Sequence, residues 1–383
     1  MLNKLRWPWV GGVERVAEQI FERLPERYPV SMTYVYISQT DCFQDQKISE
    51  HQRAIELPNF FYTWFRRTLI GRMPWSFRLF AWVRRQACEH DAMLLHWPFP
   101  LGLLAWLWAG VGVRRAMPLH VFWHSDVRRY PLIMFFLGPL LRYMLKKSAG
   151  IIVTSPQMLQ YSPWLQAYAA KTHVVPLGVP LGRFKNPVVP VPDHLPDKFF
   201  LCVGRLAAYK GYDVLLNALK GQSWPVLIVG QGPLEQELKT LATQMGISSL
   251  RWLGECSDEE IVGLMQRCYA LLLPSVDEAE AYGIVQIEAM ACGKPVISSD
   301  LKSGVPFVNA HNVSGLIVPP RDAQALSTAM GCLWNDAALY QRLSQAAAQR
   351  AQAEFSEEKM LERLAEVLLS PHYSDLLAAG SRV

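Results

Sequence analysis

The sequence lacks paired cysteines and a recognisable export signal. Its seven cysteines are scattered and none forms a C-x-x-C pair, so neither a zinc site nor a dithiol redox motif is predicted. Scattered cysteines in a chain of 383 residues are typical of the reducing cytoplasm. The first residues, MLNKLRWPWVGG, contain no long apolar core, so no secretory signal is predicted and a cytoplasmic location is expected.

Long uninterrupted apolar runs are also scarce. Residues 92–113 carry no formal charge over 22 residues, which is long enough for a helix to span a bilayer. However, Pro98 and Pro100 interrupt this stretch, and His96 stands before them. Because proline breaks helices, the sequence favours a buried strand, a loop and a buried helix over a spanning helix.

Charge is present but unevenly distributed. The chain is 51% hydrophobic and long enough for two domains, each with its own core. Residues 1–186 hold 23 Lys and Arg against 11 Asp and Glu, a net of +12, whereas the remainder holds 15 against 22, a net of −7. A basic first half favours an anionic partner, which is a membrane surface, a phosphate group or a nucleic acid.

A proline-rich stretch divides the chain. Residues 185–197 read KNPVVPVPDHLPD, and their four prolines predict an extended linker, assigned to residues 186–198. On both sides, short β-branched runs such as LHVFW, FLCVG and PVLIVG alternate with helical patterns. Such alternation predicts an α/β fold of parallel, doubly wound sheets.

We therefore expect two Rossmann-like domains, at residues 1–185 and 199–360, and a C-terminal helix within residues 361–383 that packs back toward the first domain. Ligands of such sheets bind at the carboxyl ends of the strands, so the site is expected in a cleft between the domains.

Two stretches carry residues suited to an anion. Gly11 and Gly12 stand directly before the helical pattern VAEQIFERL, where a phosphate can approach free backbone N–H groups, although a plain tight turn explains them equally well. Arg205 follows a strand pattern and Lys210 comes five residues later. A forked guanidinium and an ammonium suit phosphate oxygens, but solvated loop cations are the alternative.

Two histidines end strand patterns. His124 follows LHVFW in the stretch HSD, and His96 stands in HWPFP at a similar place. Because ligands bind at the carboxyl ends of parallel strands, His124 is a candidate site residue. A hydrogen-bonded structural histidine is the alternative at both positions.

Two glutamates separated by seven residues follow the strand pattern LLLPS. Glu280 is expected in the loop before a helix, and Glu288 about two turns into it. The N–H groups of residues 282–284 would then be free at the helix N-terminus and face an anion. A carboxylate there suits sugar hydroxyls, whereas the alternative is two solvated acids.

These motifs, in this order, resemble glycosyltransferase family 4. The resemblance rests on GGVER, HSD, VGRLAAYKG, IVGQGP, the two glutamates with AMACGKPVIS, and SGLIVPP. It covers nearly the whole chain. Within the family, the sequence is most similar to bacterial mannosyltransferases of O-antigen or lipopolysaccharide synthesis. It implies the two-domain GT-B fold and transfer with retention of anomeric configuration.

The resemblance also implies roles for individual residues. Gly12, Arg205 and Lys210 would hold the donor diphosphate, and His124 would lie near the transferred sugar. Glu280 would bond hydroxyls of that sugar. The remaining donor-binding residues would be Tyr282, Gly283 and Ile284 through their N–H groups, and Glu288 through the ribose.

The implied reaction needs neither a metal nor another cofactor. Because no D-x-D metal motif stands on a suitable loop, Arg205 and Lys210 would stabilise the leaving diphosphate instead of a metal ion. The expected donor is GDP-mannose and the expected acceptor a lipid-linked glycan at the inner face of the plasma membrane. The alternatives are a UDP-sugar donor, a sugar-nucleotide epimerase and a non-catalytic sugar-nucleotide-binding subunit.

Two features depart from the family pattern. Only ten residues precede Gly11, and they include Lys4 and Arg6, where the family has an apolar strand and a loop. The first strand is therefore short, or the recorded start lies inside the gene. In addition, Ala281 and Tyr282 replace the commoner Gly-Phe after the first glutamate, which is a mild change.

A basic aromatic face is expected within residues 60–85. This stretch holds six Arg, nine aromatic residues and no acid, which fits contact with an anionic membrane surface. Burial of its aromatic residues in the first domain is the alternative, and no nucleic-acid motif accompanies it. The residues assigned to this face are Trp64, Arg66, Arg67, Arg72, Trp75 and Arg78.

Overall fold

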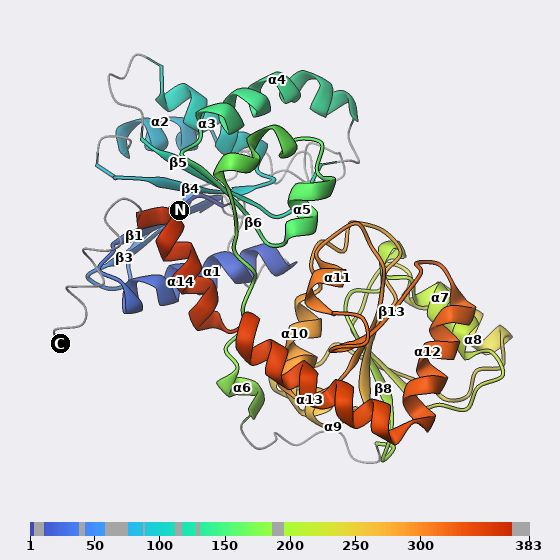
Figure 1. Ribbon diagram of the computed structural model, residues 1–383. Helices are drawn as coiled ribbons and strands as arrows, with labels where there is room; N and C mark the ends of the chain where they lie inside the picture. Colours follow the sequence, from blue (N-terminus) through green and yellow to red (C-terminus); the bar gives the residue numbers. More distant parts are fainter. Residues whose placement is uncertain are drawn as a thin grey trace. The chain divides into compact units, whose positions relative to one another are not determined.

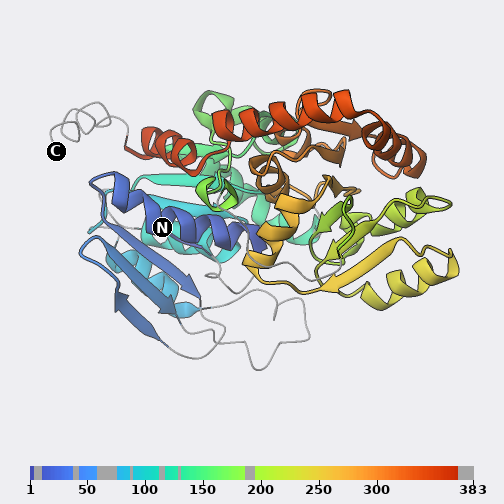
Figure 2. The ribbon, with the colours of Figure 1, turned by 90° about the horizontal axis from the view of Figure 1, so that it is seen from below.

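The computed structural model describes eight segments, namely residues 1–3, 11–37, 43–57, 76–86, 89–111, 117–127, 131–185 and 195–369. The chain forms two compact units (Figures 1 and 2). The first unit contains Met1–Thr154, Ser162–Val175 and the chain from Leu361, and the second contains Ser155–Tyr161 and Pro176–Met360. The chain therefore enters the second unit twice, at Ser155 and at Pro176, and returns to the first unit at Ser162 and at Leu361. Residues 186–194, most of the proline-rich stretch, lie outside the described residues.

The strands of the first unit form two hydrogen-bonded groups with the orders β1-β3-β2 and β4-β5-β6-β7. All pairs are parallel except β2 with β3, at the edge drawn in blue in Figure 2. Strands β4 and β5 are buried along their whole length, as expected for parallel strands covered on both faces. The strands are β1 (Met32–Ile37), β2 (Gln44–Lys47), β3 (Gln52–Leu57), β4 (Met93–Trp97), β5 (Leu119–Trp123), β6 (Gly150–Val153) and β7 (Thr172–Val174).

Residues 1–3 join the two groups of strands. Leu2 forms parallel bridges with Val35 of β1 and with Leu95 of β4. Its N–H donates to the Leu94 carbonyl at 2.8 Å, and its carbonyl accepts from the His96 N–H at 3.0 Å. A short segment thus occupies the centre of the sheet, where the family pattern predicts an apolar first strand.

Helices cover both faces of this sheet. Figure 1 shows α2, α3 and α4 on one side and α1 on the other. In α1 the apolar residues recur every three or four positions, so that Val16, Ile20 and Leu24 are buried on one face. The helices of this unit are α1 (Gly11–Arg27), α2 (Phe77–Gln86), α3 (Pro100–Ala109) and α4 (Pro131–Lys147), with a 3₁₀ helix η2 (Gln166–Lys171).

The second unit is built on one fully parallel sheet with the order β10-β9-β8-β11-β12-β13. The order reverses between β8 and β11, so this is the topological switch point at which such sheets bind ligands. The strands are β8 (Phe200–Val203), β9 (Val226–Val229), β10 (Leu250–Gly254), β11 (Ala270–Leu273), β12 (Val296–Ser299) and β13 (Gly315–Val318).

The main core of this unit lies between the sheet and the side chains of α7, α8 and α12. Figure 1 shows α7 and α12 on one side of the sheet and α10 on the other, which makes it doubly wound as predicted. The remaining elements are α5 (Pro156–Tyr161), α6 (Gly182–Lys185), η3 (Ala208–Lys210), α7 (Tyr212–Leu219), α8 (Glu235–Gln244), α9 (Asp258–Arg267), α10 (Ile284–Ala291), α11 (Val305–Val308), α12 (Ala323–Asn335), α13 (Ala337–Glu354) and α14 (Glu357–Leu369), whose last turns belong to the first unit.

Within the uncharged stretch at residues 92–113, Met93–Trp97 form β4 and Pro100–Ala109 form α3. The interpretation as a buried strand followed by a helix is therefore confirmed. In the part of the chain that the structure describes, no helix is both long enough and apolar enough to cross a bilayer.

Candidate active site

Glycines hold the loop after β8 against neighbouring loops. Gly211 has a φ of 68°, and a Cβ there would lie 2.1 Å from the Pro274 carbonyl oxygen. The Val276 N–H donates to the Tyr209 carbonyl at 2.8 Å. Because only glycine allows this approach, the sequence Lys210-Gly211 fixes where the Lys210 side chain starts.

Similar contacts join the loops after β8 and β9. A Cβ on Gly230 would lie 2.2 Å from the Gly204 carbonyl oxygen, and one on Gly232 would lie 2.3 Å from that of Leu206. The Leu206 N–H donates to the Gln231 carbonyl at 3.0 Å. The motifs VGRL and IVGQGP therefore meet through their backbones, at the carboxyl ends of two adjacent strands.

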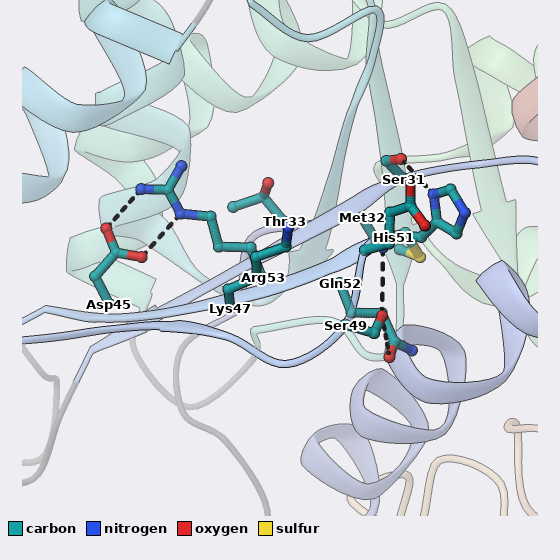
Figure 3. A pocket seen from close by; sticks show the side chains of 10 residues that line it. Ser31, Met32, Thr33, Asp45, Lys47, Ser49, His51, Gln52 and Arg53 are labelled. Carbon is teal, nitrogen blue, oxygen red and sulfur yellow. Dashed lines mark hydrogen bonds and ion pairs between the residues drawn. The ribbon is translucent and has the colours of Figure 1, made fainter.

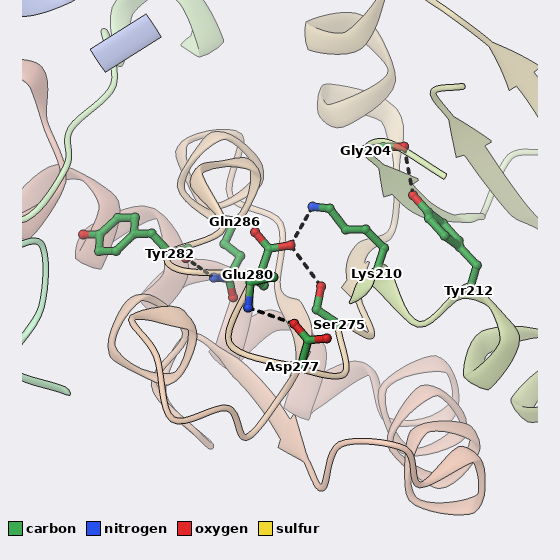
Figure 4. Close-up of polar contacts among 9 residues, drawn as sticks. Gly204, Lys210, Tyr212, Ser275, Asp277, Glu280, Tyr282 and Gln286 are labelled. Carbon is green, nitrogen blue, oxygen red and sulfur yellow. Dashed lines mark hydrogen bonds and ion pairs between the residues drawn. The ribbon is translucent and has the colours of Figure 1, made fainter. Parts of the chain in front are cut away.

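The centre of the site is an ion pair. Lys210 Nζ lies 2.6 Å from Glu280 Oε2, and both side chains are about 10% exposed. Ser275 Oγ donates to the same carboxylate oxygen at 3.0 Å. Figure 4 shows Glu280 between Ser275 and Lys210. Both contacts use Oε2, and Oε1 accepts no hydrogen bond from a described residue.

The ion pair controls the charge of Lys210. Burial lowers the pKa of Lys210, but attraction to Glu280, with weaker effects of Tyr209 and Cys202, outweighs burial and raises the pKa above its usual value. Lys210 is therefore a permanent cation near neutral pH. A lysine ammonium has three N–H donors, so it can keep Glu280 and still donate to a ligand oxygen.

Arg205 begins the same loop and is exposed. Among the described residues, none forms a hydrogen bond or ion pair with its guanidinium. An unpaired guanidinium next to a paired ammonium gives this loop a net positive charge. The two predicted anion-binding residues thus share one loop but differ in how they are held.

Helix α10 begins where the sequence predicts it. Gly283 precedes it with a φ of 69°, and a Cβ there would lie 2.7 Å from Leu273 Cδ2. The N–H groups of Gly283 and Ile284 donate to no other described residue. They stand at the positive end of the helix dipole, which favours an anion.

Two predicted residues near this helix are buried. The Tyr282 side chain is buried and its carbonyl accepts from Gln286 Nε2 at 3.0 Å. Glu288 lies in the second turn of α10 and is also buried.

His124 and Gly12 belong to the first unit. Gly12 is the second residue of α1 and is exposed. His124 directly follows β5 and is buried, with its ring stacked on that of Phe122 at 4.4 Å between centroids. The structure therefore places both residues at the ends of elements that the sequence predicts.

His96 forms a hydrogen bond with His124. His96 lies within β4 rather than after it, and its Nδ1 is 2.9 Å from His124 Nε2. Burial lowers the pKa of His124 to about 3. Burial also lowers the pKa of His96, and its neighbour His124 adds to this effect. Both rings are therefore neutral near pH 7.

One nitrogen of the pair has no partner. His96 Nε2 is buried and has no hydrogen-bond partner among the described residues. With or without a proton, it is a buried polar atom left unsatisfied, at a cost of about 1–3 kcal/mol. In the bond between the two rings one nitrogen donates and the other accepts, and the tautomers of the rings decide which.

Most of the predicted membrane face lies outside the described residues. This holds for Trp64, Arg66, Arg67, Arg72 and Trp75. The sixth residue, Arg78, is exposed in the first turn of α2, and its guanidinium carbon lies 6.0 Å from the ring centre of Phe43.

A hollow of about 420 Å³ lies on the first unit (Figure 3). Its lining includes Ser31, Thr33, His51 and the ion-paired residues Asp45 and Arg53. It is formed by the first residues of the parallel strands β1 and β3, whereas His124 follows the last residue of β5. Because α/β sheets bind ligands at the carboxyl ends of their strands, this hollow is a poor candidate for the active site.

The sequence reasoning missed Ser275 and underrated His96. Ser275 follows β11 within LLLPS, the stretch from which the position of Glu280 was predicted. The rule that selected His124, a polar residue at the carboxyl end of a parallel strand, also selects Ser275. Across the described segments, no group of three or more His, Cys, Asp or Glu residues is arranged to hold a metal ion.

Comparisons with known proteins extend these observations. The family model described as "Glycosyl transferase 4-like domain" matches residues 11–178, and the model "Glycosyl transferases group 1" matches residues 191–350. The chain is 35% identical over 263 residues to the D-rhamnosyltransferase WbpZ of Pseudomonas aeruginosa, covering 68% of each protein. It is 28% identical over 359 residues to O-antigen chain mannosyltransferase C of Escherichia coli, covering 92% of each.

A solved structure has the same architecture. HepE of Anabaena, in complex with UDP, is similar to this chain with a TM-score of 0.74 and 21% identity, over 96% of this chain and 98% of that one. At this level of identity the likeness shows the fold alone. It confirms the predicted fold class of two doubly wound domains.

Proposed function

Because the chain belongs to glycosyltransferase family 4 and has the GT-B fold, we propose that it transfers a manno-configured hexose to a lipid-linked glycan of a bacterial surface polysaccharide. The observation that carries this proposal is the match to an O-antigen mannosyltransferase over 92% of both chains. GDP-mannose is the first candidate donor.

A second donor follows from the other relative. D-rhamnose is 6-deoxy-D-mannose, so the sugars named for the two relatives share one ring configuration and differ only at C6. A GDP-linked 6-deoxy-D-mannose is therefore the second candidate donor. A UDP-sugar, which contains the nucleotide bound in the HepE structure, is the third candidate.

Charge in the loop after β8 supports a diphosphate leaving group. Breaking the bond between sugar and phosphate builds negative charge on the diphosphate. Arg205 supplies an unpaired cation, Lys210 supplies spare N–H donors, and the start of α10 supplies backbone N–H groups. Fixed donors of this kind each stabilise such a transition state by about 3–4 kcal/mol.

In this proposal Glu280 binds hydroxyl groups of the transferred sugar. Its Oε2 is held by Lys210 and Ser275, so its orientation is fixed, and Oε1 remains as an acceptor for sugar hydroxyls. Since Glu280 is already neutralised by a cation, it is poorly suited to attack the anomeric carbon. The carboxylate therefore binds substrate and does not form a covalent intermediate.

The anomeric configuration is then retained because transfer takes place on one face of the sugar. The bond between the anomeric carbon and the phosphate oxygen breaks while a bond to the acceptor hydroxyl oxygen forms on the same face. The departing phosphate oxygen takes the proton of that hydroxyl. His124, as a neutral ring, provides a hydrogen bond to the sugar without adding another cation to Arg205 and Lys210.

The donor is identified first by ligand stabilisation. We expect GDP and GDP-mannose to raise the melting temperature of the purified protein without added metal, and UDP, dTDP and UDP-glucose to leave it unchanged. A ligand at about 100 times its Kd stabilises by about 2.7 kcal/mol, which gives a measurable shift. Stabilisation by the UDP ligands alone would assign the donor to the third candidate.

Transfer itself is tested with an acceptor. Release of GDP from GDP-mannose should require a lipid-linked oligosaccharide, and the product should keep the α-configuration of the donor by NMR. Nucleotide release or sugar conversion without acceptor would favour an epimerase. Binding without any transfer would favour a non-catalytic subunit.

A further inference from the structure

An exposed apolar face runs along α4. Leu132, Phe135 and Phe136 are each at least 75% exposed, although side chains of this kind are normally buried. Ile133, Leu140 and Tyr143 on the same helix are also exposed. Because these residues recur at spacings of three and four, they lie together on one side of the helix.

The opposite side of α4 packs firmly on the first unit. Met134, Leu141 and Leu145 are buried. A Cβ on Gly138 would lie 3.0 Å from the ring of Trp164, and the Lys146 carbonyl accepts a hydrogen bond from Lys171 Nζ at 2.9 Å. The helix, which lies along the top of Figure 1, is therefore fixed in place and presents its outer face as a rigid surface.

Cations border the apolar face, and α4 itself carries no acid. Arg142, Lys146 and Lys147 are exposed in the second half of α4, and the helix contains no Asp or Glu. An apolar stripe continued by cations fits a bilayer with anionic headgroups, since the rings enter the interface while the cations meet the headgroups. Each such cation contributes about 1 kcal/mol to binding at an anionic surface.

We propose that the outer face of α4 docks this protein onto an anionic lipid surface. A second copy of the chain fits this face less well. Pairing two α4 faces would bury Arg142, Lys146 and Lys147 in an interface where α4 offers no acid to neutralise them. The lipid surface meets both the apolar and the cationic parts of the face.

This inference deepens the proposed function, because it names the surface that would bring the enzyme to a lipid-linked acceptor. It differs from the basic aromatic face predicted at residues 60–85. Its test measures binding rather than transfer, so a wrong donor or acceptor leaves its outcome unchanged, and failure of docking leaves the transfer assay valid.

The experiment is co-sedimentation of the full chain with vesicles of phosphatidylcholine alone and with vesicles that contain roughly 30 mol% of the anionic lipid phosphatidylglycerol. We expect binding to the anionic vesicles. Phe135→Ser/Phe136→Ser should lower the partition coefficient at least tenfold, since it removes two interfacial rings. Lys146→Gln/Lys147→Gln should lower it about 30-fold on anionic vesicles.

Two variants serve as controls. Val313→Ser changes an exposed apolar residue of the second unit and should leave vesicle binding unchanged. Phe77→Ser changes an exposed aromatic residue of α2 and tests the face predicted from the sequence. Since all of these side chains are exposed, the melting temperature of each variant should match that of the parent protein.

Three results would overturn the proposal. The first is no binding of the parent protein to anionic vesicles. The second is a loss of binding in Phe77→Ser with no loss in either α4 double variant. The third is a dimer in sedimentation velocity that Phe135→Ser/Phe136→Ser dissociates, which would assign the face to a second copy of the chain.

Discussion

The two units carry their candidate site residues in opposite electrostatic states. In the second unit, Lys210 and Glu280 are ionised and paired, and Arg205 is an exposed cation beside them. In the first unit, His96 and His124 are buried, hydrogen-bonded to each other and neutral near pH 7. The second unit therefore offers positive charge to a ligand, whereas the first offers hydrogen bonds from uncharged rings.

This difference matches the division of labour in the proposed reaction. The departing diphosphate is the anion, and cations must stabilise it more in the transition state than in the bound donor. A charged imidazolium near the sugar would oppose the positive charge that develops there. Keeping the histidines neutral avoids this repulsion. The reaction should therefore be impaired by removing a positive charge from the second unit and by adding one to the histidines of the first.

The largest expected effect comes from breaking the buried ion pair. Lys210→Met leaves Glu280 buried without a cation, and Glu280→Gln leaves Lys210 without an anion. Each should lower the free energy of unfolding by about 3 kcal/mol and abolish measurable turnover. Chemical denaturation and GDP-release assays would measure both quantities. The surface pair of Lys239 and Glu235, at 41% and 32% exposure, is the control, and Lys239→Met should cost less than 1 kcal/mol.

The double variant Lys210→Met/Glu280→Gln separates stability from catalysis. It removes both charges, so stability should return while turnover stays lost. Recovery of turnover would show that the pair is only structural.

The ion pair also predicts a dependence of stability on pH. Because the pKa of Lys210 is raised, the stabilisation is present at neutral pH and is lost only as the pH rises above the ordinary lysine value of 10.5.

Replacing Arg205 tests the role of positive charge in the second unit without disturbing its packing. Since Arg205 is exposed, Arg205→Ala should leave the melting temperature unchanged, but turnover should fall at least about 100-fold because a leaving-group contact is lost. Arg205→Lys should restore only part of it, since an ammonium lacks the forked geometry. Lys220→Ala, at an exposed lysine after α7, is the control. Turnover within a few-fold of the parent would exclude Arg205 from the reaction.

The second unit was far easier to predict than the first. Its strands β8, β9 and β11 fall within the predicted stretches, because each is a short apolar run bounded by Gly or Pro. In the first unit, β1 and β3 were missed, and Leu2 was not recognised as the centre of the sheet. A segment of three residues carries no periodicity, and its pairing on both sides depends on strands distant in sequence.

The candidate site shows the same limit at the level of single residues. The sequence placed Lys210 and Glu280 in one site but predicted separate ligands for them, whereas the structure pairs them. The pairing depends on the contact of Gly211 with the Pro274 carbonyl, a tertiary approach that residue spacing does not encode. The bond between His96 and His124 likewise depends on the register of β4 and β5.

Glu288 provides a smaller effect, on nucleotide binding. Glu288→Ala removes the proposed acceptor for the ribose hydroxyls, and a hydrogen bond to a charged group is worth about 1.5–3 kcal/mol. GDP affinity measured by calorimetry should therefore fall about tenfold or more. Glu259→Ala, at an exposed acid of α9, is the control. Equal GDP affinity in Glu288→Ala and the parent protein would contradict the assignment.

The neutral histidines predict a dependence of stability on pH. The pKa of His124 is lowered to about 3 by burial, so between its ordinary value of 6.5 and 3 the unfolded chain binds a proton that the folded chain does not. Stability should thus fall on acidification, by up to about 1.4 kcal/mol per pH unit for this group. His124→Asn should reduce that slope, and exposed His51→Asn should not. Equal slopes in the parent and His124→Asn would show that His124 is protonated in the folded protein.

The smallest expected effect is that of a chelator, and it tests the basis of the comparison. If Arg205 and Lys210 stabilise the diphosphate, no divalent cation is needed there, because a metal ion would compete with these cations for the same phosphate oxygens. EDTA should therefore leave the rate of GDP release by the parent protein unchanged within experimental error. Added Mg²⁺ should leave it unchanged too. Strong inhibition by EDTA, reversed by Mg²⁺, would mean that the protein cations alone do not stabilise the leaving group. The second unit would then hold the donor through a metal ion, and the large loss expected for Arg205→Ala would have to be explained by substrate binding alone.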